Sequence, residues 1–193
     1  MHEQIPWFPA WGIRFKDEIK NTNEILSMFN ELKTDNRWLL LAFDVAASER
    51  HLWTAWYSTK RNQKNGKMIA NSVDAEFIRL IAGTHQVRVA FNNAGIRNGD
   101  QSVWIIRLPE RKIGDEISQV FINRDSYNNY DEEANILIEK MNGGLLSKRP
   151  APIKGGLKRI GYNREITTQS LEECFILHPV SYTHLTLPTN REV

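Results

Sequence analysis

Eight polar or cationic side chains between residues 65 and 96 are of types that bind RNA. In this stretch, "NGKMIANSVDAEFIRLIAGTHQVRVAFNNAGI", two short helices are predicted on either side of Gly83. A helix N-terminus offers N–H groups and positive potential to a phosphate, and the unstacked bases of single-stranded RNA bond to amide, hydroxyl and imidazole groups. The predicted RNA-binding residues are Lys67, Asn71, Ser72, Arg79, Thr84, His85, Gln86 and Arg88.

Some of these residue types also have a purely structural interpretation. Asn71, Ser72 and Thr84 stand where helix N-caps are expected, and Gln86 could hold the corner together. This alternative needs no ligand, and the sequence leaves it open for each residue taken singly.

A DNA-reading helix-turn-helix is another interpretation of the corner. Such units place a small residue one helical turn before the corner glycine, where the two helices touch, and here Arg79 occupies that position. A charge at this contact disfavours the DNA-reading form, although Val89 suits the apolar position of the second helix. The net charge of +2 is compatible with either nucleic acid.

Residues with catalytic potential are few. Cys174 is the single thiol, and the sequence has no zinc-site spacing, nucleophile elbow or phosphate-binding glycine loop. His51 stands early in a predicted helix, where packing or a helix-end bond is the simplest role. Asp44 ends a buried strand, a place where α/β enzymes often carry an acid. We predict a protein that is not an enzyme and uses no cofactor or metal, with a small α/β enzyme as a third interpretation.

The segment "FDVAASERHLWTAWYSTKRN", followed by the stretch from Asn65 to Ile96, resembles the small tRNA-binding and kinase-binding subunit of the archaeal and eukaryotic KEOPS complex (the TPRKB-like family). Its most specific part is the run from Gly83 to Val87, and the resemblance covers about residues 11 to 146. The other matching residues are Asp44, His51, Leu52, Ala55, Gly66, Asn71, Ser72, Glu76, Ala90, Gly95 and Ile96.

The resemblance implies a non-catalytic role. KEOPS makes threonylcarbamoyladenosine on tRNAs that read codons beginning with A. A catalytic subunit transfers the group, and an atypical kinase subunit supports it with ATPase activity. The subunit resembled here binds the kinase and captures tRNA, chiefly by its 3′ CCA end. The implied partners are therefore the kinase subunit and tRNA, with no small-molecule substrate.

The segment "EEANILIEKMNGGLL" looks like the C-terminal helix of that family. Its apolar side chains fall on more than one helix face, whereas a lone domain needs only one buried stripe. Covering the sheet would use some of this surplus, but a partner's groove is a common place for such a helix. The predicted kinase-binding residues are Ile136, Leu137, Ile138 and Met141.

Strands and helices alternate over the first three quarters of the chain, which predicts a small single-domain α/β fold with a sheet packed against several helices. Strands are expected at "GIRF", "RWLLLAFDV" and "VWIIRL", the second of them buried on both faces. The helices of the corner should begin at Ser72 and Thr84 and end at Gly83 and Gly95, with Phe91 facing inward. Other helices are expected at "NTNEILSMFNELK", "ERHLWTAWYSTKRNQ", "KIGDEISQVFI" and "EEANILIEKMN".

The domain is expected to span residues 1–146. Residues 147–179 include "SKRPAPIKGGLKRIGYNR", which is rich in Pro, Gly and cations and predicts a flexible basic extension. Residues 180–193, "VSYTHLTLPTNREV", resemble translated sequencing-adapter read-through and are set aside.

Composition indicates a soluble globular protein, with 41% hydrophobic and 25% charged residues. The N-terminus "MHEQIPWFPAWG" has no apolar region of the kind found in signal peptides, and the longest apolar run, "WLLLAFDVAA", is too short to cross a bilayer. A single cysteine suits a reducing compartment. We therefore expect a cytoplasmic protein without membrane contact.

Overall fold

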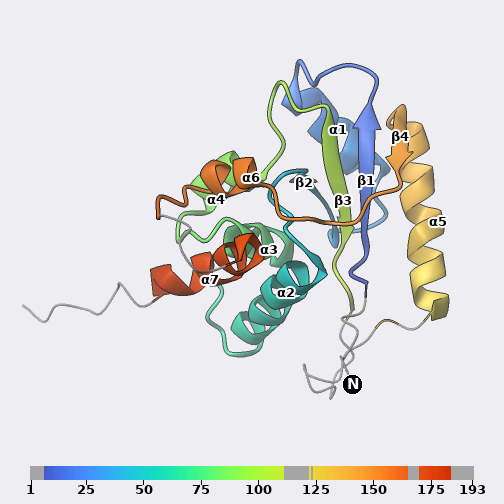
Figure 1. The fold of residues 1–193 in the computed structure, drawn as a ribbon. Helices are drawn as coiled ribbons and strands as arrows, with labels where there is room; N and C mark the ends of the chain where they lie inside the picture. The colour runs from blue at the N-terminus through green and yellow to red at the C-terminus, as the bar shows by residue number, and fades with distance from the viewer. Residues whose placement is uncertain (1–6, 111–121, 123, 165–169, 184–193) are drawn as a thin grey trace, which may run out of the picture.

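A four-stranded antiparallel sheet forms the centre of the protein (Figure 1). The computed structural model describes residues 7–110, 122, 124–164 and 170–183. The strand order is β2-β3-β1-β4, so the first strand lies inside the sheet. The strands are β1 (Ala10–Phe15), β2 (Trp38–Ala42), β3 (Ser102–Arg107) and β4 (Gly143–Leu146). The α/β fold and all three predicted strands are confirmed.

Helices cover both faces of the sheet, which makes three layers (Figure 1). Successive side chains of a strand point to opposite faces, so Trp38 and Leu40 of β2 join one core and Leu39 and Leu41 join the other. This confirms that β2 is buried on both faces. The first core lies beneath α1 (Thr22–Leu32) and α5 (Arg124–Lys140), and the second beneath α2 (Glu49–Lys64), α3 (Val73–Ile81), α4 (Val87–Ala94), α6 (Lys154–Arg159) and α7 (Leu171–Thr183).

The segment after residue 146 differs from the expected flexible extension, because its described part packs on the domain. Leu157 and Ile160 of the α6 region and Cys174 and Phe175 of α7 are almost completely buried in the core beneath α2 and α3. The prediction rested on the absence of a regular apolar period. A few apolar side chains at irregular positions are enough to hold this segment on the domain, because they pack into a core that other parts of the chain form.

Arg159 anchors this segment to the rest of the fold. Its Nη1 donates to Asp44 Oδ1 (3.2 Å) and Asp100 Oδ1 (2.9 Å), and its Nη2 donates to Asp100 Oδ2 (2.8 Å) and to the Gly95 carbonyl (2.8 Å). Three residues earlier in α6, Gly156 lies so close to the segment after β2 that an added Cβ would stand 1.7 Å from the Asp44 carbonyl oxygen. Charge pairing and close backbone contact therefore hold α6 in place.

Two further expectations concern the helices around α5. The helix predicted at residues 112–122 lies outside the described residues, apart from Ile122. The predicted C-terminal helix ends at Lys140, and Asn142 turns the chain with a φ of 55°, so Gly143 and Gly144 begin β4 and do not extend the helix.

Candidate functional site

The helix-corner-helix unit is formed by α3 and α4. Gly83 follows the end of α3 with a φ of 60°, a left-handed conformation that side-chain-bearing residues seldom adopt. A Cβ at this position would also lie 2.3 Å from His178 Cδ2 of α7. Gly83 therefore both turns the chain and lets α7 approach the corner, which confirms that this glycine ends the first helix.

A buried carboxylate, Glu76, ties the unit together. It is fully buried, and it accepts hydrogen bonds from Arg79 Nη2 (2.7 Å) and Nε (2.9 Å), from Asn62 Nδ2 (2.8 Å), and from the backbone N–H groups of Ile69 and Ala70 (3.2 and 3.1 Å). Burial alone would raise the pKa of Glu76. The hydrogen bonds from Arg79, Asn62 and Ala70 outweigh burial and hold the pKa at about 2.

Arg79 belongs to this buried network, which corrects its expected place among the RNA-binding residues. Only 5% of its surface is exposed, and its Nη1 donates to the Thr84 carbonyl at 2.9 Å. The guanidinium thus joins the end of α3 to the corner. The charge that argued against a DNA-reading unit is neutralised here by Glu76, three residues earlier on the same helix.

The other seven predicted RNA-binding residues stay at the surface. Lys67, Asn71 and Ser72 are exposed before α3, and Gln86 and Arg88 are exposed at the start of α4. Thr84 and His85 are half-buried at the corner. The two groups stand at opposite ends of α3, about 13 Å apart along its nine residues. They do not form one compact pocket, and only an extended ligand would reach both.

The start of α4 suits an anion better than the start of α3. Neither N-cap, Ser72 for α3 or Gln86 for α4, bonds the first helical turn through its side chain. The first turn of α3 carries Asp74 and Glu76, whereas that of α4 carries no acid. Gln86 takes the cap position expected of Thr84, whose Oγ1 accepts a hydrogen bond from the Gln86 N–H at 3.2 Å.

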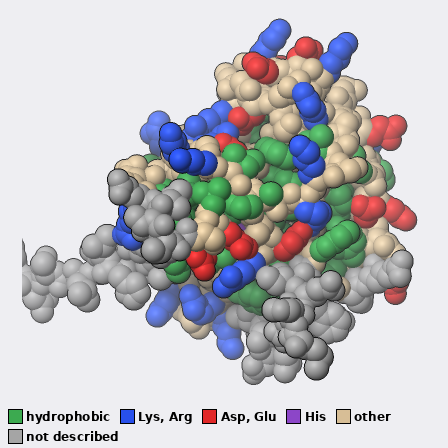
Figure 2. All heavy atoms as spheres, in the orientation of Figure 1, with side chains coloured by type: hydrophobic (Ala, Val, Ile, Leu, Met, Phe, Trp, Pro, Cys, Tyr) green, Lys and Arg blue, Asp and Glu red, His purple; other side chains and the backbone are tan. Residues whose placement is uncertain are grey.

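Basic side chains gather near these helices. Figure 2 shows lysine and arginine side chains over the end of α2 and over α4 and α6, whereas acidic side chains are more frequent over α5. The last turn of α2 carries Arg61 and Lys64, and that of α6 carries Lys158. Figure 2 shows further lysine and arginine side chains at the top of the molecule and over the strands, so cations surround the corner but are not confined to its side of the sheet.

The predicted kinase-binding residues, three in α5 and Met141 directly after it, are mostly core. Leu137, Ile138 and Met141 are 3–4% exposed and pack under the sheet with Phe29. Only Ile136 is open to a partner, at 50% exposure. This corrects the kinase-binding assignment for the three buried side chains. The additional apolar residues of α5 cover the sheet, which is the alternative role considered from the sequence.

A shallow groove with a mixed apolar and polar lining lies between α1, β2 and the α3–α4 unit, with a volume of about 390 Å³. Phe91, expected to face inward, is 44% exposed at its wall, and Leu26 of α1 is 38% exposed opposite. Beneath them lie Phe29 and Leu40. Two large exposed apolar side chains beside buried ones make this groove a candidate contact surface for a protein partner.

Neither candidate catalytic side chain is placed for catalysis. His51 is 1% exposed, its Nδ1 accepts the Ala47 N–H at 3.3 Å, and burial lowers its pKa to about 3, so it is neutral. Asp44 pairs with Arg159. Among the described residues, no three His, Cys, Asp or Glu side chains gather in a way that could hold a metal ion. Within the same residues, no helix has the length and apolar character needed to cross a bilayer.

The family described as kinase binding protein CGI-121 matches residues 15–137. The chain belongs to this family. The match confirms the resemblance noted in the sequence and takes in the whole helix-corner-helix unit and the groove beside it. The CGI-121 match ends within α5, so β4, α6 and α7 lie outside it. No curated protein matches the chain.

Proposed function

We propose that this CGI-121 protein is a non-catalytic subunit of a KEOPS-type complex, which binds the kinase subunit and captures tRNA by its 3′ CCA end to support threonylcarbamoyladenosine modification. The family match over residues 15–137 carries the kinase part of this proposal. The exposed polar and cationic residues at the start of α4 support the RNA part.

The groove between α1 and α4 is the proposed kinase contact. Its occupant is an apolar segment of the kinase that covers Leu26 and Phe91, the two exposed apolar residues of its walls. Few interface residues carry most of a binding free energy, and large apolar side chains set in a concave surface are typical of them. Lys33 and Asp74 at the groove rim allow polar contacts around the apolar centre.

Phe91→Glu is expected to weaken binding of the kinase subunit at least about tenfold, because it places a charge in an apolar contact. Isothermal titration calorimetry with the kinase from the same source measures this. Ile136→Glu is the matched control, since Ile136 is equally exposed but lies on α5. Both variants should keep the wild-type Tm. Loss of binding in Ile136→Glu alone would place the kinase on α5 and exclude the groove.

The start of α4 is the proposed site of the RNA end. Arg88 lies in the first turn, where its cation adds to the positive end of the helix. Thr84, His85 and Gln86 stand directly before it and supply groups that bond to base edges or to a ribose. A single-stranded end fits because its phosphate and base are both accessible.

Arg88→Ala is expected to weaken tRNA binding by about 1–3 kcal/mol through loss of a charge-assisted hydrogen bond, and to lower the salt slope by about one. Arg14→Ala, a change at an exposed arginine of β1, serves as the control. The decisive comparison uses tRNA without its CCA end, which should bind the wild type and Arg88→Ala almost equally, because both changes delete one contact. Additive losses would place Arg88 and the CCA end at separate sites.

Gel shifts with intact tRNA, tRNA lacking CCA and duplex DNA separate the proposal from its alternatives. Preference for duplex DNA would favour a helix-turn-helix regulator, and turnover of a substrate by the isolated chain would favour an enzyme. The burial of His51 and the pairing of Asp44 with Arg159 give the enzyme no support among the described residues.

A further inference from the structure

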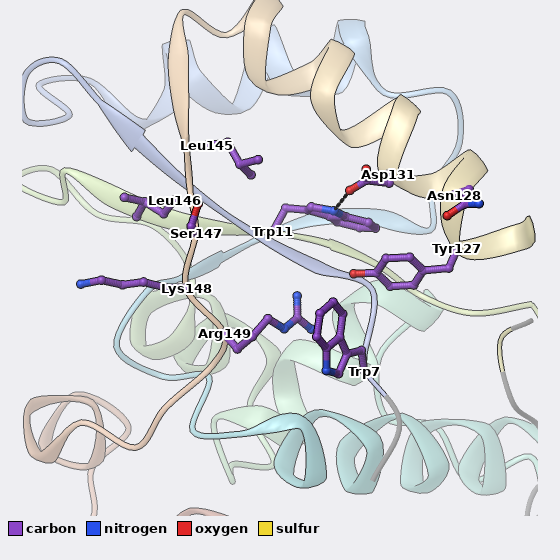
Figure 3. A pocket seen from close by; sticks show the side chains of 10 residues that line it. All are labelled: Trp7, Trp11, Tyr127, Asn128, Asp131, Leu145, Leu146, Ser147, Lys148 and Arg149. Atoms are coloured by element: carbon purple, nitrogen blue, oxygen red, sulfur yellow. Dashed lines mark hydrogen bonds between the residues drawn. The ribbon is translucent and has the colours of Figure 1, made fainter. Parts of the chain in front are cut away.

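A second hollow lies far from the corner, between the N-terminal end of α5, the strand β4 and the chain that leads into β1 (Figure 3). Its volume of about 420 Å³ is within the range of small-molecule sites. Its walls are formed by Trp7, Trp11, Tyr127, Asn128, Asp131 and residues 145–149. Tyr127, Asn128 and Asp131 lie inside the family match, whereas Trp7, Trp11 and residues 145–149 lie outside it.

Aromatic rings dominate one side of the hollow. Tyr127 stands between Trp7 and Trp11, with ring centroids 6.4 Å and 5.7 Å away. Trp7 keeps 62% of its surface exposed, the largest exposed fraction among the large apolar side chains of the described residues. An indole left open beside other rings is a surface on which a flat, aromatic ligand packs favourably.

Polar groups complete the wall. Asp131 accepts a hydrogen bond from Trp11 Nε1 at 2.6 Å, which orients both side chains. Asn128 and Lys148 are exposed at the rim, and their amide and ammonium point away from Trp7 in Figure 3, so each must turn to reach a ligand on that ring. These groups supply hydrogen-bond donors and acceptors and one exposed cation.

Arg149 is a cation of the hollow that is already paired. Its Nε donates to Glu49 (2.7 Å), its Nη1 and Nη2 donate to the carbonyls of Ala10 and Phe8 (2.5 and 2.6 Å), and its guanidinium lies 5.2 Å from the Trp7 ring. A fixed guanidinium already occupies the cation position against Trp7. A second cation would be repelled there. Because Glu49 neutralises the charge of Arg149, Lys148 is the lining cation for which the structure describes no ion pair, and it can pair with a negative group of a ligand.

We propose that this hollow binds a nucleotide, with the base packed on the Trp7 ring and the phosphate paired with the Lys148 ammonium. Asn128 and Asp131 then face the base edge, where amide and carboxylate groups read exocyclic amines. The source is a free nucleotide or one unit of a single-stranded RNA, which present the same chemistry. The hollow involves α5 and β4 and not α4, so it stands independently of the proposed capture of the CCA end.

The test is isothermal titration calorimetry of the full chain with three probes: adenosine 5′-monophosphate, ribose 5-phosphate and a six-residue oligoadenylate. Adenosine 5′-monophosphate should bind the wild type, and Trp7→Ala should weaken it about tenfold or more through lost stacking. Lys148→Ala should weaken it severalfold and reduce its salt dependence. Ile136→Ala, on α5 but outside the hollow, should bind as the wild type does.

Each result bears on the proposal. Tighter binding of oligoadenylate than of the mononucleotide, sensitive to Trp7→Ala, supports the site and identifies an RNA strand as the source; equal binding supports a free nucleotide. Ribose 5-phosphate binding as tightly as adenosine 5′-monophosphate would overturn base stacking. Binding of neither nucleotide probe, or binding unaffected by Trp7→Ala in a variant with wild-type Tm, would overturn the site itself.

Discussion

Glu76→Ala is expected to lower the free energy of unfolding by about 3–5 kcal/mol, the usual cost of removing one partner of a buried ion pair. The change would leave the Arg79 guanidinium buried without its counter-charge, since Arg79 is 5% exposed. It would also remove the acceptor of the Ile69 and Ala70 N–H groups, whose hydrogen bonds hold the loop before α3 against that helix. Urea unfolding followed by circular dichroism measures the loss.

A double variant separates charge from packing in this network. Glu76→Met combined with Arg79→Met removes both charges, and it should recover much of the stability lost in Glu76→Ala, because no charge is then left unpaired. If Glu76→Ala alone costs less than about 1 kcal/mol, water must reach Arg79, and the corner is looser than the structure indicates.

The same carboxylate makes stability depend on pH in a defined direction. The pKa of Glu76 is about 2 in the folded protein, below its ordinary value of 4.5, so the unfolded chain takes up the proton more readily. Its contribution is therefore complete above pH 4.5 and is lost as pH falls from there towards 2. The stability difference between the wild type and Glu76→Gln should accordingly shrink between pH 6 and pH 3.

Phe175→Ala is expected to cost about 3–5 kcal/mol, as is typical when a large core side chain is removed and a cavity remains. Phe175 is completely buried, with its ring 5.5 Å from that of His51 in α2. Leu177→Ala is the control on the same helix, where 41% exposure limits the loss to about 1 kcal/mol. Thermal unfolding should show the difference as a drop in Tm of about 10 °C for Phe175→Ala alone.

This pair of variants tests whether the C-terminal segment is part of the domain. Equal and small effects at both positions would mean that α7 is not packed in solution, and the expectation of a flexible extension after residue 146 would then hold. A large effect at Phe175 alone would show that residues beyond the CGI-121 match stabilise the fold of the matched part.

Local patterns in the sequence determined much of the fold. The continuous apolar run of β2 and the glycine at the α3–α4 corner act through neighbours in the chain, so periodicity and turn chemistry are sufficient to predict them. Ser48, a residue type typical of helix N-caps, caps α2, and its side chain accepts the His51 N–H. The run from Gly83 to Val87 also carried the family resemblance that the match confirms.

Only the tertiary structure decided which polar side chains remain available to a ligand. Arg79 looked like an RNA-binding cation, and its i,i+3 spacing from Glu76 was the one local sign of a pair. The burial of Glu76 depends on Asn62 of α2 and on the loop before α3. The residue pattern of α3 alone does not predict this burial. The pair Asp44–Arg159 joins residues that are 115 positions apart in the sequence. The rings of Trp7 and Tyr127 are in contact although the two residues are 120 positions apart. Such contacts follow from how the layers pack. The burial of each side chain is set by elements that are remote in the sequence, so the periodicity of its own segment does not predict these contacts.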